Sequence, residues 1–368
     1  MNWKNKCKTA FYLIVLTALA TLTSGFAVAN ERPLTVVSWG GSYARACVKG
    51  YHEAFTAETG IKINLEDYNG GLAQIRAQVE SGNVHWDVVD MEIPDMVRGC
   101  DEGLLEPIPV NALPAGADGT PAAQDFPLGT MTDCGPATIF YSTVYAYNEK
   151  NIPGEKPTTM ADFFDLEKFP GRRGMRRTPL VNLEFALIAD GVPLNKVYPT
   201  LNTPEGVDRA FRKLDTIKDH IVWWEAGAQP PQMLADGEVV MSTAYNGRIF
   251  NAQVLEDQPF VIVWDGQILD TGGLVIVAGT KNLEAAKKFL NFAATAKAIA
   301  GVGRYIAYSP TRISAEALIS THAEKGVEMN PHMPNSPQNS KRALRNSWEW
   351  WSDHIDEMNE RFSAWLAQ

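Results

Sequence analysis

The sequence predicts an α/β protein with two lobes. Apolar segments of strand length alternate along the chain with segments in which apolar residues recur at helical spacing. Strands that are separated by single helices imply parallel sheets with helices on both faces. The chain has 368 residues, more than one hydrophobic core usually organises, so we expect the core to be divided between two lobes.

The first 29 residues have the features of a secretory signal peptide. Three lysines (Lys4, Lys6 and Lys8) precede a short apolar run, and small residues follow it up to Ala29. A basic start, an apolar run and an A-x-A site are typical of an exported protein whose leader is removed, here after Ala29. The run is too short to span a bilayer, which takes about 20 apolar residues.

The chain is acidic. Its formal net charge is −10, and removal of residues 1–29, which hold three lysines and no acid, changes it to −13. Such a surface is a poor partner for nucleic acid or anionic lipid. No later stretch is long and apolar enough for a membrane helix, so we expect an exported monomer.

Three cysteines follow the leader: Cys47, Cys100 and Cys134. In an oxidising compartment one pair can form a disulfide, and a Cys100–Cys134 bond would staple the long loop between a predicted helix and a predicted strand. Cys47 would then stay free; the alternative is three buried thiols. With no C-x-x-C and no histidine pair at metal-ligand spacing, we expect neither a metal site nor a cofactor.

The first lobe is predicted from alternating strands and helices. A helix over 43–59 carries apolar residues at intervals of four and stops at Gly60. The other segments, in chain order, are strands at 34–38 and 61–67, a helix with apolar residues at Leu72, Ile75 and Val79, and a strand at 86–91.

The rest of the chain begins with a proline- and glycine-rich loop at 107–129. A long apolar strand at 137–147 follows, long enough to pass from one lobe into the other. Thr159 and Thr203 are predicted helix caps. Further segments are strands at 239–243, 259–264 and 274–278, a helix at 283–293 and an aromatic-rich helix at 348–365. We expect this last helix to pack on its own lobe rather than to bind a partner helix.

Motifs of catalysis are missing from the sequence. There is no G-x-S-x-G elbow, no G-x-x-x-x-G-K-[ST] loop and no G-x-G-x-x-G after a strand. An exported hydrolase with Ser42 or Ser142 as nucleophile would need a nearby base, and His52 lies about three helical turns away. We therefore expect a binding protein rather than an enzyme.

Several segments, by their order and spacing, carry a family resemblance. They are Val37–Gly41, Glu58–Ile63, Trp86–Asp90, Tyr141–Asn148, Phe169–Arg173, Ala235–Val239, Ala244–Arg248 and Pro310–Arg312. Together they resemble periplasmic ABC-transporter solute-binding proteins of the spermidine/putrescine type, over nearly all of the mature chain. The resemblance implies a type II two-lobed binding-protein fold with crossing strands as its hinge and a small ligand in the cleft. It also implies a periplasmic location and an ABC permease of the inner membrane as partner.

The resemblance further implies lobe boundaries and binding residues. Residues 30–139 and 272–315 would form the first lobe, and residues 140–271 and 316–368 the second. Ligands in such folds lie at the carboxyl ends of strands. The expected binding residues there are the aromatic Trp39, Tyr43 and Tyr245, the acid Glu92, and Ser42 in a Gly-Gly-Ser segment that suggests an anion nest.

Arg248 departs from the family pattern. Polyamine-binding relatives carry Asp or a small polar residue there, whereas an arginine repels an ammonium group at 4 Å by roughly 4 kcal/mol. A carboxylate would instead receive charge-assisted hydrogen bonds. We therefore expect an amino acid or γ-aminobutyrate-like zwitterion, with Arg248 on its carboxylate and Asp270 or Glu92 on its amine. Asp270 reaches this place only with a two-residue shift, because an ungapped match puts Gly272 there.

Other interpretations remain open at this point. The acid pair that polyamine binders carry before a helix of the second lobe is replaced here by residues 178–181, and the nearest acid is Glu184. A polyamine carrier is nonetheless the main alternative. A second alternative is a ferric-ion binder that uses Tyr141, Tyr145 and Tyr147. Arg248 could also serve an internal salt bridge, for example to Asp270.

Overall fold

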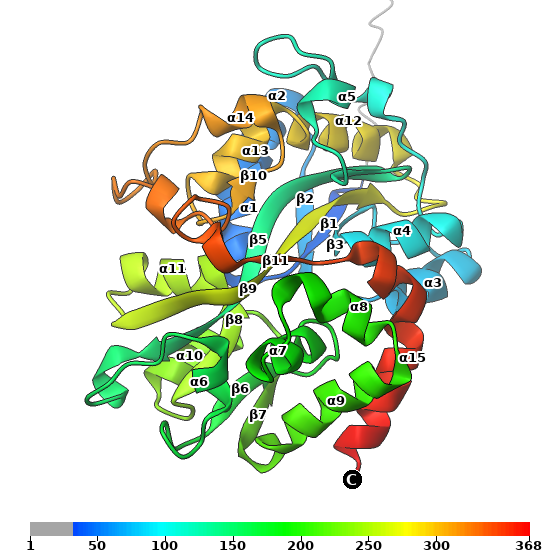
Figure 1. The fold of residues 1–368 in the computed structure, drawn as a ribbon. Helices are drawn as coiled ribbons and strands as arrows, with labels where there is room; N and C mark the ends of the chain where they lie inside the picture. Colours follow the sequence, from blue (N-terminus) through cyan, green and yellow to red (C-terminus); the bar gives the residue numbers. More distant parts are fainter. Residues whose placement is uncertain (1–31) are drawn as a thin grey trace, which may run out of the picture. The chain divides into compact units, whose positions relative to one another are not determined.

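The computed structural model describes residues 32–368 (Figure 1). The predicted signal peptide at 1–29 lies outside the described residues. From Pro33 to Gln368 the chain forms one unit of mixed α/β structure around a central sheet, as predicted. Among the described residues, no helix combines the length and apolar character needed to cross a membrane.

The strands of the sheet lie in the order β2-β1-β3-β9-β5-β8-β6-β7. Their bounds are β1 Leu34–Ser38, β2 Ile63–Asp67, β3 Val88–Glu92, β5 Gly135–Asn148, β6 Arg173–Arg176, β7 Ile221–Trp224, β8 Met241–Tyr245 and β9 Phe260–Ile276. Strands β1, β2 and β3 are parallel to one another, as are β6, β7 and β8. We call the side with β1–β3 the first lobe and the side with β6–β8 the second lobe; the exact lobe boundaries remain a prediction.

Two long strands join the lobes (Figure 1). Strand β9 pairs antiparallel with β3 at its C-terminal end and with β5 along most of its length. Strand β5 in turn pairs antiparallel with β8. The predicted crossing strand at 137–147 is thus confirmed, and it has a partner of 17 residues.

The separate strands predicted at 259–264 and 274–278 are wrong, because both belong to β9. The polar and glycine residues between them suggested a break in the sequence. In the structure residues 268–273 pair with β5, and residues 264–267 lie at an irregularity between two paired stretches of one strand. Gly273 is needed for the close approach of the two strands, since a β-carbon there would lie 2.1 Å from the carbonyl oxygen of Pro136.

Helices cover the sheet. They are α1 Gly41–Cys47, α2 Glu53–Thr59, α3 Ala73–Glu80, α4 Ile93–Asp101, α5 Ala122–Asp125, α6 Met160–Phe164, α7 Asn182–Ala189, α8 Val197–Leu201, α9 Pro204–Asp215, α10 Gln229–Ala235, α11 Asn246–Leu255, α12 Leu283–Ala293, α13 Ala296–Gly303, α14 Ile313–Glu316 and α15 Trp348–Leu366. A π-helical turn, Val48–His52, connects α1 to α2, so the predicted helix over 43–59 is one continuous element. It ends at Gly60, whose φ of 74° is left-handed.

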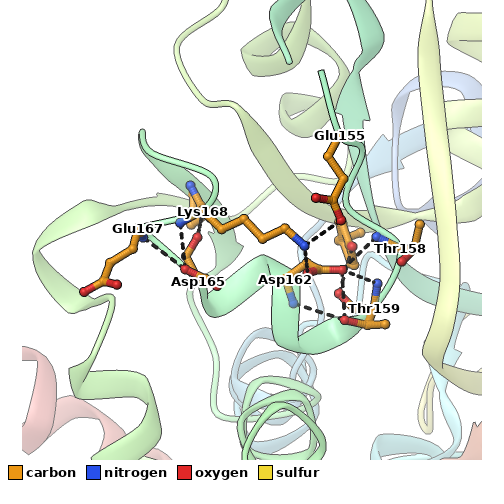
Figure 2. A network of polar contacts seen from close by, with 9 residues as sticks. Glu155, Thr158, Thr159, Asp162, Asp165, Glu167 and Lys168 are labelled. Carbon is orange, nitrogen blue, oxygen red and sulfur yellow. Dashed lines mark hydrogen bonds and ion pairs between the residues drawn. The ribbon is translucent and has the colours of Figure 1, made fainter. Parts of the chain in front are cut away.

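The predicted helix caps are confirmed. Figure 2 shows the capping box of α6, in which Asp162 Oδ2 accepts hydrogen bonds from the backbone N–H groups of Thr158 and Thr159, each at 2.9 Å. Lys168 lies beside this box and pairs with Glu155 at 2.8 Å. The Thr203 side chain accepts from Gly206 N at the start of α9.

The C-terminal helix α15 packs on the second lobe, as expected. Trp223 of β7 contacts Phe362 and Trp365 with ring centroids 5.5 and 6.1 Å apart. The helix also reaches the first lobe, where Asp356 pairs with Arg98 of α4 at 2.7 Å. It therefore touches both sides of the cleft.

Cys100 and Cys134, the pair that the sequence singled out, form a disulfide with Cα atoms 5.8 Å apart. It ties the end of α4 to the start of β5. Cys47 is a buried free thiol.

Opening this disulfide should lower the free energy of unfolding by about 2–4 kcal/mol, because the bond restricts a long loop in the unfolded chain. Urea unfolding with and without reductant would measure the difference. In a Cys100→Ser/Cys134→Ser variant the loss should already be present, and reductant should change nothing further. Equal stability of the oxidised and reduced protein would contradict the prediction.

Candidate ligand-binding site

Two adjoining cavities lie between the lobes. The first, which we call the aromatic cavity, has a volume of about 30 Å³ and is lined by Trp39, Tyr43, Asp90, Glu92, Ile139, Tyr141, Tyr245, Arg248, Gly272 and Tyr308. The second, the polar cavity, has a volume of about 10 Å³ and is lined by Glu92, Tyr141, Thr143, Arg176, Leu180, Val181, Asn182, Trp224, Thr243, Tyr245 and Asp270. Glu92, Tyr141 and Tyr245 belong to both, so the cavities share a wall.

The cavities form where parallel strands end. Trp39 follows β1, Glu92 is the last residue of β3, and Tyr245 is the last residue of β8. Carboxyl ends of parallel strands are the usual ligand-binding edge of open α/β sheets. The strand pattern of the sequence therefore brings these three predicted residues together from two lobes.

Arg248 lies in the first turn of α11 and is 3% exposed. Its Nη1 donates to Gly40 O at 2.6 Å and its Nη2 to Trp39 O at 3.0 Å. Both acceptors belong to the first lobe, so this arginine of the second lobe bridges the cleft. Its Nε has no hydrogen-bond partner among residues 32–368. The alternative of a salt bridge to Asp270 is wrong, because the guanidinium bonds to these carbonyls instead.

Asp90 was not expected at the site, because the sequence placed it within a buried strand. It is 2% exposed, and its Oδ2 accepts a hydrogen bond of 2.6 Å from the Tyr43 hydroxyl. No described residue gives its Oδ1 a hydrogen bond. Burial raises the pKa of Asp90 to about 7, although Tyr43, Trp39 and the charge of Arg248 partly offset this effect.

Arg176, at the end of β6, is a second arginine that the sequence did not reveal. Its Nη1 lies 3.1 Å from Glu92 Oε1, and its Nη2 donates to Asn69 O at 3.2 Å. Its guanidinium carbon lies 5.6 Å from the Trp39 ring and 5.9 Å from the Tyr245 ring. The site thus contains two guanidinium groups, both carried by the second lobe.

Asp270 lines the polar cavity, but both of its oxygens are engaged. Oδ1 accepts from Thr271 N at 2.7 Å and Oδ2 accepts from Asn346 Nδ2 at 2.5 Å. Burial and the nearby charge of Glu92 raise the pKa of Asp270 to about 7. Ser42 is half-buried and is not among the lining residues of either cavity.

The acid Glu184 and the aromatic Tyr145 do not line either cavity. Glu184 lies on α7, as expected, but it is fully buried against Trp351 of α15 at 2.6 Å and Tyr198 at 3.0 Å. Tyr145 packs in the core of the second lobe. Within the described part of the chain, no group of three metal-ligating side chains occurs.

The buried Asp90 carboxyl should make the stability of the protein fall as pH rises. Because its pKa is raised from 3.8 to about 7, the folded protein holds a proton that the unfolded chain has released across that window. The cost is about 1.4 kcal/mol per pH unit. Asp90→Asn should therefore gain stability over the parent protein between about pH 5 and pH 7, as measured by urea unfolding. The exposed Asp353 offers a control, since Asp353→Asn should not alter how the free energy of unfolding depends on pH. If Asp90→Asn also left this pH dependence unchanged, the prediction would be refuted.

Comparisons with known proteins show the family of the chain. A family model described as bacterial extracellular solute-binding protein matches residues 50–335. The chain is 40% identical over 360 residues to a gamma-aminobutyric acid-binding protein of Pseudomonas aeruginosa, covering 97% of this chain and 98% of that one.

Solved structures give the same result. The periplasmic binding protein MotA from A. tumefaciens B6, in complex with glucopine, is 30% identical with a TM-score of 0.82, covering 91% of this chain and 99% of that one. A GABA receptor is 31% identical with a TM-score of 0.76, covering 91% and 98%. These relatives are substrate-binding proteins of transporters rather than enzymes. The fold, the cleft and these matches identify the chain as a member of the bacterial extracellular solute-binding proteins, the ligand-capturing partners of ABC permeases.

Proposed function

We propose that this protein is the periplasmic substrate-binding component of an ABC importer and that it binds γ-aminobutyric acid (GABA) or a similar amino acid. One observation carries the proposal. Two residues that line the aromatic cavity have a buried atom with no hydrogen-bond partner in the described part of the chain: the donor Arg248 Nε and the acceptor Asp90 Oδ1. A zwitterion supplies a carboxylate for Arg248 and an ammonium group for Asp90.

The energetic argument rests on these two atoms. A buried polar group that lacks its hydrogen bond costs about 1–3 kcal/mol. A ligand carboxylate accepts from Arg248, and a ligand ammonium donates to Asp90, so both costs are relieved on binding. Glu92 is already paired with the charge of Arg176, and Asp270 is bonded on both oxygens. We therefore assign the amine to Asp90, with Glu92 and Asp270 nearby as further negative charge.

The walls of the cavity suit a small organic cation. Trp39, Tyr43 and Tyr245 lie around it, with Tyr141 and Tyr308. Faces of such rings attract an ammonium group by about 0.5–2 kcal/mol when it is desolvated.

The relatives support the same ligand class. One relative is named a gamma-aminobutyric acid-binding protein and one solved structure a GABA receptor. Two others are complexes with glucopine and with agropinic acid. A polyamine fits the site less well, because it brings only positive charge to two cavities that are each lined by a guanidinium group.

The mechanism requires no chemical step. Arg248 and Arg176 of the second lobe bond to groups of the first lobe, so these contacts form when the lobes are closed. A ligand held between Arg248 and Asp90 bonds both lobes and adds its own free energy to the closed form. The closed form would then be the one that an ABC permease recognises.

Titration calorimetry on the purified protein should detect GABA binding and much weaker putrescine binding. Replacing Arg248 by methionine should weaken GABA binding by about 10- to 100-fold, the worth of a charge-assisted hydrogen bond. Arg209→Met, at an exposed arginine of α9 outside both cavities, should bind GABA like the parent. Tight putrescine binding without response to GABA or other amino acids would refute the proposal.

GABA binding should also release protons near pH 7. Asp90, with a pKa of about 7, is partly protonated before the ligand binds, and an ammonium group beside it favours the carboxylate. The binding enthalpy should therefore depend on the ionisation enthalpy of the buffer at about pH 7 and lose this dependence near pH 9. In Asp90→Asn the dependence should disappear. Equal buffer dependence in the variant and the parent would assign the proton to another group.

A further inference from the structure

Arg176 occupies a cage that has the composition of an ammonium-binding site. Its guanidinium carbon lies 5.6 Å from the ring of Trp39 and 5.9 Å from the ring of Tyr245. The carboxylate of Glu92 lies 3.1 Å from its Nη1. Aromatic faces together with a carboxylate are what proteins use to hold organic cations.

The cage is partly buried beside an open pocket that Glu92 and Arg176 also line, and its acid is hydrogen-bonded. The side chains of Arg176 and Glu92 are only 15% and 12% exposed. The Tyr141 hydroxyl donates to the same Glu92 oxygen at 3.1 Å, which orients the carboxylate. Arg176 and Glu92 come from opposite lobes, so the cage exists between the lobes rather than within one of them.

The cage adjoins the site proposed for the amine. Glu92 and Tyr245 line both the aromatic cavity, which holds Asp90, and the polar cavity, which Arg176 lines. A linear diamine with one ammonium on Asp90 would need a second acid for its other end. The nearest aromatic-walled acid in the shared wall is Glu92, and Arg176 is already there.

From this arrangement we infer that Arg176 is a specificity-determining residue, a tethered cation that fills the second ammonium site and restricts the protein to ligands with one positive group. The inference rests on the proposed function, because it takes the first ammonium to lie on Asp90. GABA and putrescine have chains of the same length but differ in one end, a carboxylate or an ammonium. Arg176 discriminates against the ammonium end, while Arg248 receives the carboxylate.

The test is a gain of function. Arg176→Met removes the charge but keeps an apolar stem between the rings, and it leaves Glu92 without its cation. Calorimetry with putrescine should show at least about tenfold tighter binding to this variant than to the parent, since a cation then meets a partly buried acid and two aromatic faces. Arg176→Lys keeps the charge and should show no such gain.

Arg177 provides the matched control. It is the next residue in the chain, its side chain is 56% exposed, and it faces Glu225 at 3.5 Å outside both cavities. Arg177→Met should bind putrescine and GABA like the parent protein. In the double variant Arg176→Met/Glu92→Gln, the gain in putrescine affinity should be lost, because the acid that receives the second ammonium has been removed.

The outcomes separate the two proposals. Circular dichroism should show that Arg176→Met and Arg176→Gln are folded. If the parent binds GABA and neither folded variant gains putrescine affinity, the tethered-cation role is overturned while the proposed function stands. If no zwitterion binds the parent yet Arg176→Met gains putrescine binding that depends on Glu92, the role of Arg176 is supported and the proposed function fails. Loss of GABA binding in Arg176→Met without any putrescine gain would make Arg176 a carboxylate ligand and would overturn the inference.

Discussion

A guanidinium group buried between two lobes needs hydrogen-bond acceptors on both sides, and this requirement determines how the cleft is built. Arg248 meets it with the carbonyl oxygens of Trp39 and Gly40, which follow the first strand. The loop can present both carbonyls inward only because Gly40 and Gly41 have φ values of 61° and 55°. A β-carbon on Gly41 would lie 2.8 Å from Arg248 Nη1, so the approach also needs the missing side chain.

The same requirement explains the cluster of acids opposite the arginines. Strand β3 pairs with β1, so Asp90 and Glu92 lie beside the loop that receives Arg248. Strand β9 pairs with β3 and with β5, so Asp270 joins this edge from the crossing pair. Each acid has a distinct state: Glu92 pairs with Arg176, Asp270 is bonded by neutral donors, and Asp90 keeps one free oxygen. Of these three acids, Asp90 is the one with a fully buried oxygen that has no hydrogen-bond partner among residues 32–368.

Much of the fold could be predicted because it depends on local rules. Capping by Thr159 and Thr203, and the end of a helix at Gly60, are set by backbone hydrogen bonds within a few residues. Trp39, Tyr245 and Arg248 were expected at the site from the family resemblance, and they lie after β1, at the end of β8 and in the first turn of α11, where ligand sites of this kind form. The continuity of β9 could not be predicted, since its middle residues resemble a turn and pair only because β5 lies beside them. Asp90 and Arg176 were missed for a similar reason, because their exposure to the cavity depends on which lobe faces them.

The charges of Arg248 and Arg176 link the ligand specificity of the protein to the closure of its two lobes. The contacts of Arg248 with Gly40 and of Arg176 with Glu92 both connect the lobes, so they contribute to the closed form and not to the open one. A zwitterion adds bonds to atoms that these contacts leave free. A dication must compete with Arg176 for Glu92. If it displaces Arg176, it removes a contact that holds the lobes together. Its binding is therefore opposed twice, by charge repulsion in the cavity and by the loss of closure, whereas an amino acid meets neither cost.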